Sequence, residues 1–115
     1  MDSSTRVVER QPAKPVMDSQ VKDLLRTRFR KLRRRVGPII MSVRMDEGLS
    51  RQDLASMLPN IVPQVWGMPD EQMVEDIENQ KYILTYVEFA NICEALGRYE
   101  DALLDVVELE ITGKD

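Results

Sequence analysis

Histidine is absent from this sequence of 115 residues, and cysteine occurs only once, at Cys93. A disulfide within the chain is therefore excluded, and a metal site built on imidazole or thiolate groups has too few ligands. The sequence also lacks a plausible Cys–His pair, a glycine-rich phosphate loop and a GxSxG motif. We therefore predict no catalytic residues, no cofactor and no metal site, and we predict that the protein is not an enzyme.

Long hydrophobic runs are missing as well. No apolar run approaches the roughly 20 residues that span a bilayer, and residues 1–12 lack the apolar stretch of a signal peptide. We therefore expect a cytoplasmic protein that has no membrane partner. The length is that of one domain, and an apolar fraction of 43% is enough for a modest core.

Positive charge is scarce outside one short segment. Residues 22–44 hold nine basic residues against Asp23 alone, a net charge of +8. Residues 46–115 hold 16 acidic residues against four basic ones, a net charge of −12. A chain divided in this way has two surfaces for different partners, or one segment that folds back onto the other.

The spacing of apolar residues predicts helices, and no alternating segment is long enough for a strand. Residues 1–17 show no apolar period and are predicted to form a disordered N-terminal tail. Residues 18–36 are predicted to form a basic amphipathic helix, whose apolar side must bury against something and carries Leu25, Phe29, Leu32 and Val36. Gly37 is expected at the C′ position of this helix, and Pro38 in the first turn of the next one.

Capping residues mark further helices within residues 38–110, so the fold class is all-α with five to six helices in a compact domain. A helix over 38–47 comes first, and the last helix, over 99–109, is expected to point Leu103, Val106 and Val107 inward. The expected helix caps and closing glycines are Gly48, Ser50 with Asp53, Asp70, Thr85 with Glu88, and Gly97.

The order of these elements resembles the Xre/Cro family of phage-repressor-like helix-turn-helix proteins. "VRMDEGLSRQDLASML" (43–58) is similar to the first helix, glycine turn and second helix of that family. "VEDIENQKYILTYVEFANICEALG" (74–97) is similar to the end of its third helix, its "IE-x-G" turn and its fourth helix. "LLDVV" (103–107) lies where the fifth helix packs. The resemblance implies a repressor-like helix-turn-helix domain, a Glu78 that is structural, and binding to double-stranded DNA, usually as a homodimer.

For this chain, the resemblance implies a transcriptional regulator with two sets of DNA-binding residues. The residues expected near the groove are Arg44, Ser50, Arg51, Gln52 and Gln72. The basic helix is expected to hold the phosphate backbone, with side chains from Arg28, Arg30, Lys31, Arg33, Arg34 and Arg35. Affinity would then come mainly from the basic helix, and base readout would be weak or unusual.

The sequence departs from the family's pattern in two ways. "PNIVPQVWGMP" (59–69) inserts about nine residues before the third helix, which redirects a helix that is positioned by a tight turn. The base-contacting positions of that helix fall on about Glu71, Gln72, Glu75 and Asp76. A carboxylate about 5 Å from a phosphate is repelled by roughly 3 kcal/mol at an effective dielectric constant near 20. Two or three such pairs cancel one good base contact, worth about 1–3 kcal/mol.

These departures leave alternatives open. The fold can be repurposed as a protein-interaction module, an antiactivator or an adaptor for a basic partner, with a surface formed by Trp66, Glu71, Glu75 and Asp76. Trp66 is either an anchor at such an interface or, as we favour, the residue that fixes the inserted loop as a lid on the core. The basic helix, in turn, either grips a polyanion or packs against the acidic surface of residues 70–110, in its own or a second molecule.

Overall fold

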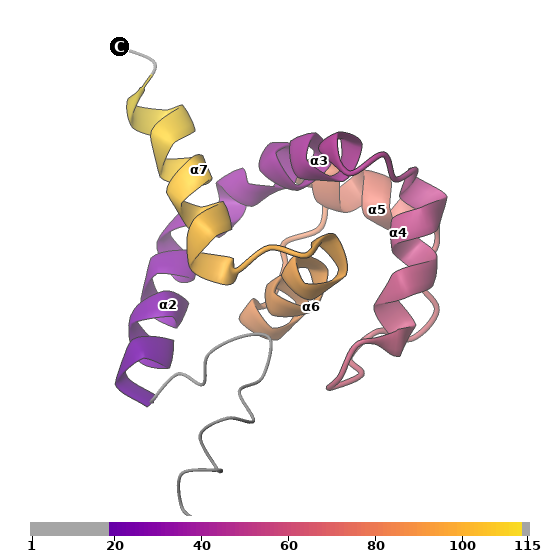
Figure 1. Cartoon of the computed structure of the whole chain (residues 1–115), viewed down its shortest axis with the longest axis horizontal. Helices are drawn as coiled ribbons and strands as arrows, with labels where there is room; N and C mark the ends of the chain where they lie inside the picture. The colour runs from indigo at the N-terminus through magenta and orange to yellow at the C-terminus, as the bar shows by residue number, and fades with distance from the viewer. Residues whose placement is uncertain (1–18, 114–115) are drawn as a thin grey trace, which may run out of the picture.

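The structure is a computed structural model that describes residues 19–113, and the predicted tail at 1–17 lies outside this range. The described part is a compact all-α domain, as the sequence predicts, with six α-helices, two short 3-10 segments and no strand (Figure 1). In chain order the elements are α2 (Ser19–Leu32), η1 (Arg33–Arg35), α3 (Val36–Asp46), α4 (Arg51–Met57), η2 (Leu58–Asn60), α5 (Glu71–Glu78), α6 (Tyr86–Leu96) and α7 (Glu100–Thr112). None of the described helices is long and apolar enough to cross a membrane.

The basic helix α2 is part of the fold. Its apolar side is buried as predicted, and Phe29 stacks on Phe89 of α6 with 4.8 Å between the ring centroids. Phe29 also meets Tyr86 edge to face, at 5.8 Å. Two aromatic contacts in addition to the buried area fix α2 against the core, so its outward side chains are carried on a rigid element.

The junction between the first two helices differs from the prediction. The basic helix was expected to run over 18–36, but α2 ends at Leu32, and α3 begins at Val36 rather than at Pro38. Gly37 is not a C′ residue, because positive φ among the described glycines occurs only at Gly48 and Gly97. A Cβ on Gly37 would lie 2.5 Å from the Ile77 carbonyl oxygen, so glycine is required here by the close approach of α3 to the end of α5.

The predicted local signals at the other helix ends are confirmed. Gly48 and Gly97 adopt the left-handed conformation after α3 and α6. Capping boxes begin α4 and α6, and an aspartate side chain caps α5. The residues concerned are Ser50 with Asp53, Thr85 with Glu88, and Asp70.

The core is built around α6, which lies inside the arc formed by the other helices (Figure 1). The buried positions of α6 are Phe89, Ile92, Cys93 and Leu96. In α7, Leu103 and Val107 are buried as predicted, but Val106 is 44% exposed and Leu104 is fully buried in its place. The prediction of an inward Val106 was therefore wrong, because only one side of the "LLDVV" segment can face the core in a helix.

The inserted loop folds back onto the domain. Trp66 is only 4% exposed and belongs to the core cluster, whereas its neighbours Val62 and Met68 are 83% and 92% exposed. Trp66 therefore anchors the loop as a lid, which is the interpretation that we favoured from the sequence. Its indole ring is not available as a contact at an interface in this conformation.

Candidate nucleic-acid interface

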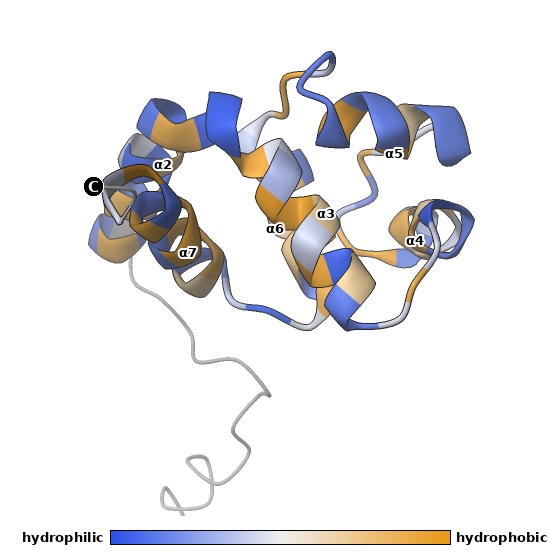
Figure 2. Ribbon diagram, turned by 90° about the horizontal axis from the view of Figure 1, so that it is seen from above, coloured by the Kyte–Doolittle hydropathy of each residue, from blue (hydrophilic) through white to orange (hydrophobic). Residues whose placement is uncertain are grey.

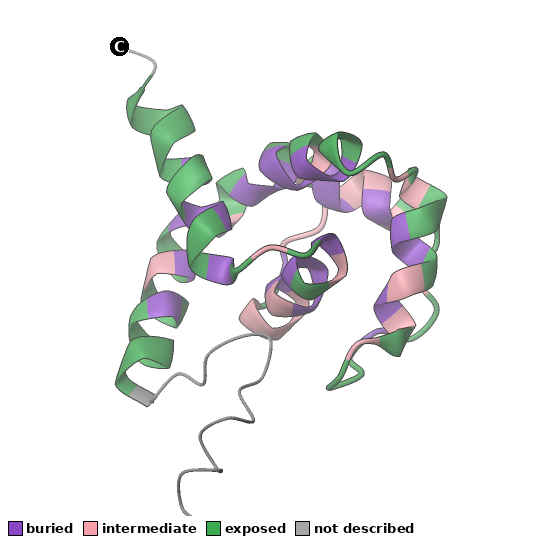
Figure 3. Ribbon diagram, viewed as in Figure 1, coloured by how far each residue is buried: buried purple, intermediate pink, exposed green. Residues whose placement is uncertain are grey.

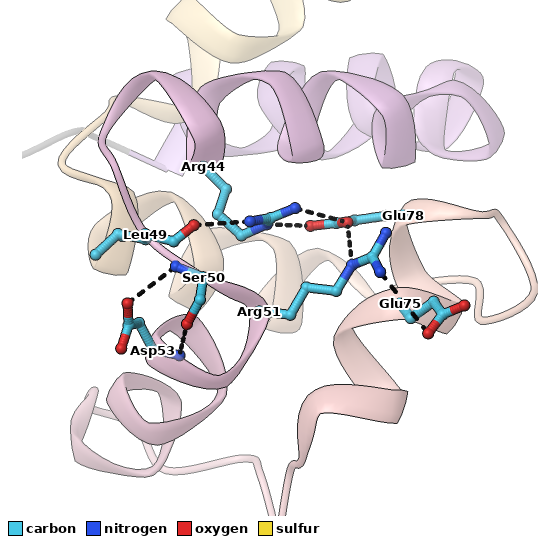
Figure 4. Close-up of polar contacts among 7 residues, drawn as sticks. All are labelled: Arg44, Leu49, Ser50, Arg51, Asp53, Glu75 and Glu78. Carbon is cyan, nitrogen blue, oxygen red and sulfur yellow. Dashed lines mark hydrogen bonds and ion pairs between the residues drawn. The ribbon is translucent and has the colours of Figure 1, made fainter.

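Two of the arginines predicted to lie near the DNA groove, Arg44 and Arg51, bind the carboxylate of Glu78. Arg44 is buried at 7% exposure, and its Nε donates to Glu78 Oε2 at 2.6 Å (Figure 4). A second donor of Arg44, Nη1, binds the Leu49 carbonyl oxygen at 2.7 Å. Arg51 Nε donates to the other oxygen of Glu78 at 2.9 Å. Arg44 therefore ties α3 to α5, and its burial does not favour the predicted DNA contact.

The surface formed by α4 and α5 was predicted to read bases, and its polar groups mostly bind one another. Ser50 accepts from the Asp53 N–H within its capping box. Gln72 Nε2 donates to Asp76 Oδ1 at 3.0 Å. Arg51 Nη1 lies 3.8 Å from Glu75 Oε1. The hydrogen bond that Arg51 donates to Glu78 is the main reason that the pKa of Arg51 is raised. Of the predicted groove residues, only Gln52 is exposed without such a bond among the described residues.

The charge of this surface remains negative. Arg51 faces two carboxylates, Glu75 and Glu78, while Glu71 and Asp70 are exposed at the start of α5. The macrodipole stabilises acids at the N-terminal end of a helix, and this explains the presence of Glu71 at the start of α5 in structural terms. Glu75 and Asp76 lie beyond the first turn and repel a phosphate backbone. The structure therefore places no net positive charge where the resemblance implies base readout.

Part of the basic helix is also neutralised within the domain. Arg28 Nη2 binds Asp105 Oδ1 at 2.5 Å and Glu108 Oε1 at 2.6 Å, both on α7. These two hydrogen bonds raise the pKa of Arg28. Arg26 lies over the ring of Tyr86, 5.3 Å from its centroid, in a cation–π contact. The prediction that Arg28 contacts phosphates is not supported by this geometry, because both acids would have to release it.

The remaining cations form a group that we call the basic ridge, defined as Arg30, Lys31, Arg33, Arg34 and Arg35. These five residues fall within six consecutive positions at the end of α2 and in η1. Four of them are exposed, Arg33 is half-buried, and none takes part in an ion pair with another described residue. Hydrophilic residues alternate with apolar ones along α2 (Figure 2). Its cations Arg30 and Lys31 are exposed, whereas Phe29 and Leu32 of the same helix are buried in the core.

Arg35 of the basic ridge and the first turn of α5 lie at different ends of that helix. Arg35 lines a shallow cavity of about 220 Å³ together with Gln80, which follows the C-terminal end of α5. Glu71 and Gln72 lie in the first turn of that helix, and an eight-residue helix separates its ends by roughly 12 Å. Arg35 therefore lies near the C-terminal end of α5, away from its first turn.

The chain matches no protein-family model, and no curated protein or solved structure is similar to it at a significant level. The resemblance to the Xre/Cro family therefore stays a prediction from the sequence.

The intramolecular partners of the arginines were the feature that the sequence analysis missed. Asp105 and Glu108 are separated from Arg28 by 77 and 80 positions in the chain. The net charges of residues 22–44 and 46–115 pointed to such pairing in general, but not to which arginine is paired. Sequence signals near Glu78 were better, because the resemblance already implied a structural role for this residue.

Proposed function

We propose that this protein binds the phosphate backbone of double-stranded DNA through the basic ridge, as a small transcriptional regulator with weak base readout. One observation carries this proposal: five neighbouring cations without an ion-pair partner among the described residues are mounted on a helix that the core fixes. Arginine guanidinium groups bind phosphate oxygens in a fork, and four of these five residues are arginines.

The number of available cations sets the expected dependence on salt. Release of condensed counterions lowers the logarithm of the affinity by about 0.9 per phosphate contact for each logarithmic unit of salt. Five contacts therefore give a log–log slope of about −4.5, since Arg28 is held by Asp105 and Glu108. Binding should depend little on base sequence, because the α4–α5 surface is acidic.

Fluorescence anisotropy with a labelled random duplex tests this proposal. We expect the wild type to bind at low salt with the slope given above, and we expect Arg33→Glu with Arg34→Glu to abolish binding. A matched control is Lys22→Glu with Lys81→Glu, which changes the net charge equally at exposed positions outside the ridge. If the control variant loses binding as completely as the ridge variant, the loss is due to net charge and not to the basic ridge. Absence of any wild-type binding at low salt would refute the proposal.

A second candidate function is supported by the acidic side of α5. Among the described ion pairs, Arg51 is the only cation that pairs with Glu71, Glu75 or Asp76, and such an acidic surface suits a basic protein partner. An NMR titration with random duplex separates the two functions, because the first predicts shifts over residues 26–35. If the duplex leaves these residues unchanged and a lysine-rich peptide shifts residues 70–80 in the wild type but not in Glu75→Lys, the second function is correct.

A further inference from the structure

Helix α7 has two apolar sides. One side, formed by Leu103, Leu104 and Val107, is buried in the core at 0–1% exposure. The other side carries Ala102, Val106 and Leu109, which are all exposed, with Leu109 at 69%. We call these three residues the outer stripe of α7. A helix that serves only to close the core needs apolar residues on one side, so the second set has no role in the described fold.

The outer stripe has the spacing of a helix–helix contact. Its members are separated by four and then three positions, which places them on one side of the helix and matches the a and d positions of a heptad. From Glu108 onward α7 is exposed, and this end of the helix extends beyond the body of the domain (Figures 1 and 3). Scattered exposed apolar residues are normal on a protein surface, but a regular stripe on a projecting helix is typical of a docking site.

Carboxylates border the outer stripe on both sides. From the helical period, Asp101, Asp105 and Glu108 fall along one edge and Glu110 along the other. Arg28 binds Asp105 and Glu108 from the side of α2, yet these two side chains keep 69% and 51% of their surface exposed. Asp101 and Glu110 take part in no ion pair with another described residue. The stripe therefore lies in a field of negative charge.

We infer that the outer stripe of α7 is a docking site for an amphipathic helix of a partner protein, whose apolar side is flanked by lysine or arginine. Charge complementarity selects this occupant, because positions beside the a and d residues choose the partner of a helix pair by the sign of their charge. A second copy of the chain fits poorly, since pairing one α7 with another places carboxylates against carboxylates. The three stripe residues are not part of the basic ridge, although Glu110 beside the stripe lines one cavity with Arg35. The inference goes beyond the proposed DNA binding.

A pair of designed peptides tests the inference on the full chain. Both are about 21 residues long, three heptads with leucine at a and d, and they differ in carrying lysine or glutamate at e and g. We expect the lysine peptide to shift the NMR signals of Ala102, Val106 and Leu109, and to bind more weakly as salt rises from about 50 to about 300 mM. The glutamate peptide should leave these signals unchanged.

Three variants of the chain make the test specific. Val106→Asn with Leu109→Asn should lower the affinity for the lysine peptide by at least about tenfold, since apolar anchors dominate such contacts. Asp101→Asn with Glu110→Gln leaves the stripe residues unchanged and removes only charge. This variant should bind the lysine peptide several-fold more weakly. Met68→Gln changes an apolar residue that is 92% exposed in the inserted loop and should have no effect. All three variants should still bind DNA, so failure here is separate from failure of the proposed function.

Three results would overturn the inference. The first is a lysine peptide that leaves α7 unchanged, and the second is equal binding of the two peptides. The third is a wild-type dimer in sedimentation that Val106→Asn with Leu109→Asn converts to a monomer, since a second copy would then cover the stripe. Monomeric wild-type protein with peptide shifts on α7 would support the inference.

Discussion

Arg44 and Glu78 form a buried ion pair, with 2.6 Å between Arg44 Nε and Glu78 Oε2. The two residues are 34 positions apart and join α3 to the C-terminal end of α5. Neither carboxylate oxygen of Glu78 is left without a donor, because Arg51 binds the second one. Glu78 is 2% exposed, so this carboxylate is held by two guanidinium groups in place of water.

Removing one partner of this pair should be costly. We expect Glu78→Ala to lower the free energy of unfolding by about 3–5 kcal/mol, because it leaves the buried Arg44 guanidinium without its carboxylate. Arg44→Ala should cost less, because Arg51 still binds Glu78. Arg44→Met with Glu78→Met should also cost less than Glu78→Ala. Urea denaturation of the three variants measures these differences. Two single variants that each lose less than about 1 kcal/mol would contradict a buried, mutually dependent pair.

The packing at Gly37 predicts that even a methyl group is too large. A Cβ there would lie 2.5 Å from the Ile77 carbonyl oxygen and 2.8 Å from that of Glu78, both of them backbone atoms. We expect Gly37→Ala to destabilise the fold by about 1–3 kcal/mol, as overpacking does. Gly67→Ala is the matched control, since a Cβ at Gly67 meets nothing within 4 Å. Thermal unfolding of both variants tests the contrast, and equal melting temperatures would exclude the close approach of α3 to α5.

Gln80 is a position where glycine should be better than the natural residue. It is the only described non-glycine residue with positive φ, at 66°, and it occupies the glycine position of the "IE-x-G" turn. Relief of left-handed strain is worth about 1 kcal/mol, so Gln80→Gly should raise the stability although glycine loses more entropy on folding. Gln80→Ala keeps the strain and serves as the control in the same denaturation experiment. A glycine variant no more stable than the alanine variant would contradict the strain.

The burial of Trp66 predicts that the inserted loop contributes to stability as well as covering the core. It is the only tryptophan, so the native protein should fluoresce at short wavelength and shift to longer wavelength on unfolding. Trp66→Ala should cost about 3–5 kcal/mol, as the loss of a large buried aromatic side chain does. Trp66→Phe should cost much less, because the indole Nε1 is buried without a hydrogen-bond partner in the structure. A native spectrum like that of exposed tryptophan would rule out the lid.

The capping box of α4 predicts a stability change at acid pH. The backbone N–H of Ser50 donates to Asp53 at 2.9 Å, and this bond, followed by that of the Ser50 side chain, lowers the pKa of Asp53 below 3.8. A carboxyl group with a depressed pKa in the folded state stabilises the fold above its unfolded pKa, and this contribution disappears as the pH falls through the folded pKa. Asp53→Asn should therefore be less stable than the wild type at pH 7, with a difference that narrows below about pH 4. A difference that does not depend on pH, measured by denaturation at several pH values, would contradict this assignment.

The caps and the apolar stripes were within reach of the sequence because each depends on residues a few positions apart. Ser50 with Asp53 and Thr85 with Glu88 make their bonds across three positions, and the structure has both. The buried side of α2 followed from its helical period in the same way. The choice between Val106 and Leu104 did not, because both suit a helix and only the direction of the neighbouring helices decides which one is buried.

The candidate site was predicted less well, and the reason is distance along the chain. The sequence by itself determined that this chain forms short capped helices and that it carries a cluster of arginines beside an acidic remainder. Only the tertiary structure decided that Arg28, Arg44 and Arg51 pair with carboxylates, while the basic ridge has no such partner within residues 19–113. It also decided that Gly37 serves a close approach rather than a helix end. Ion pairs and backbone contacts of this kind join helices that are far apart in sequence, and no local spacing rule specifies them.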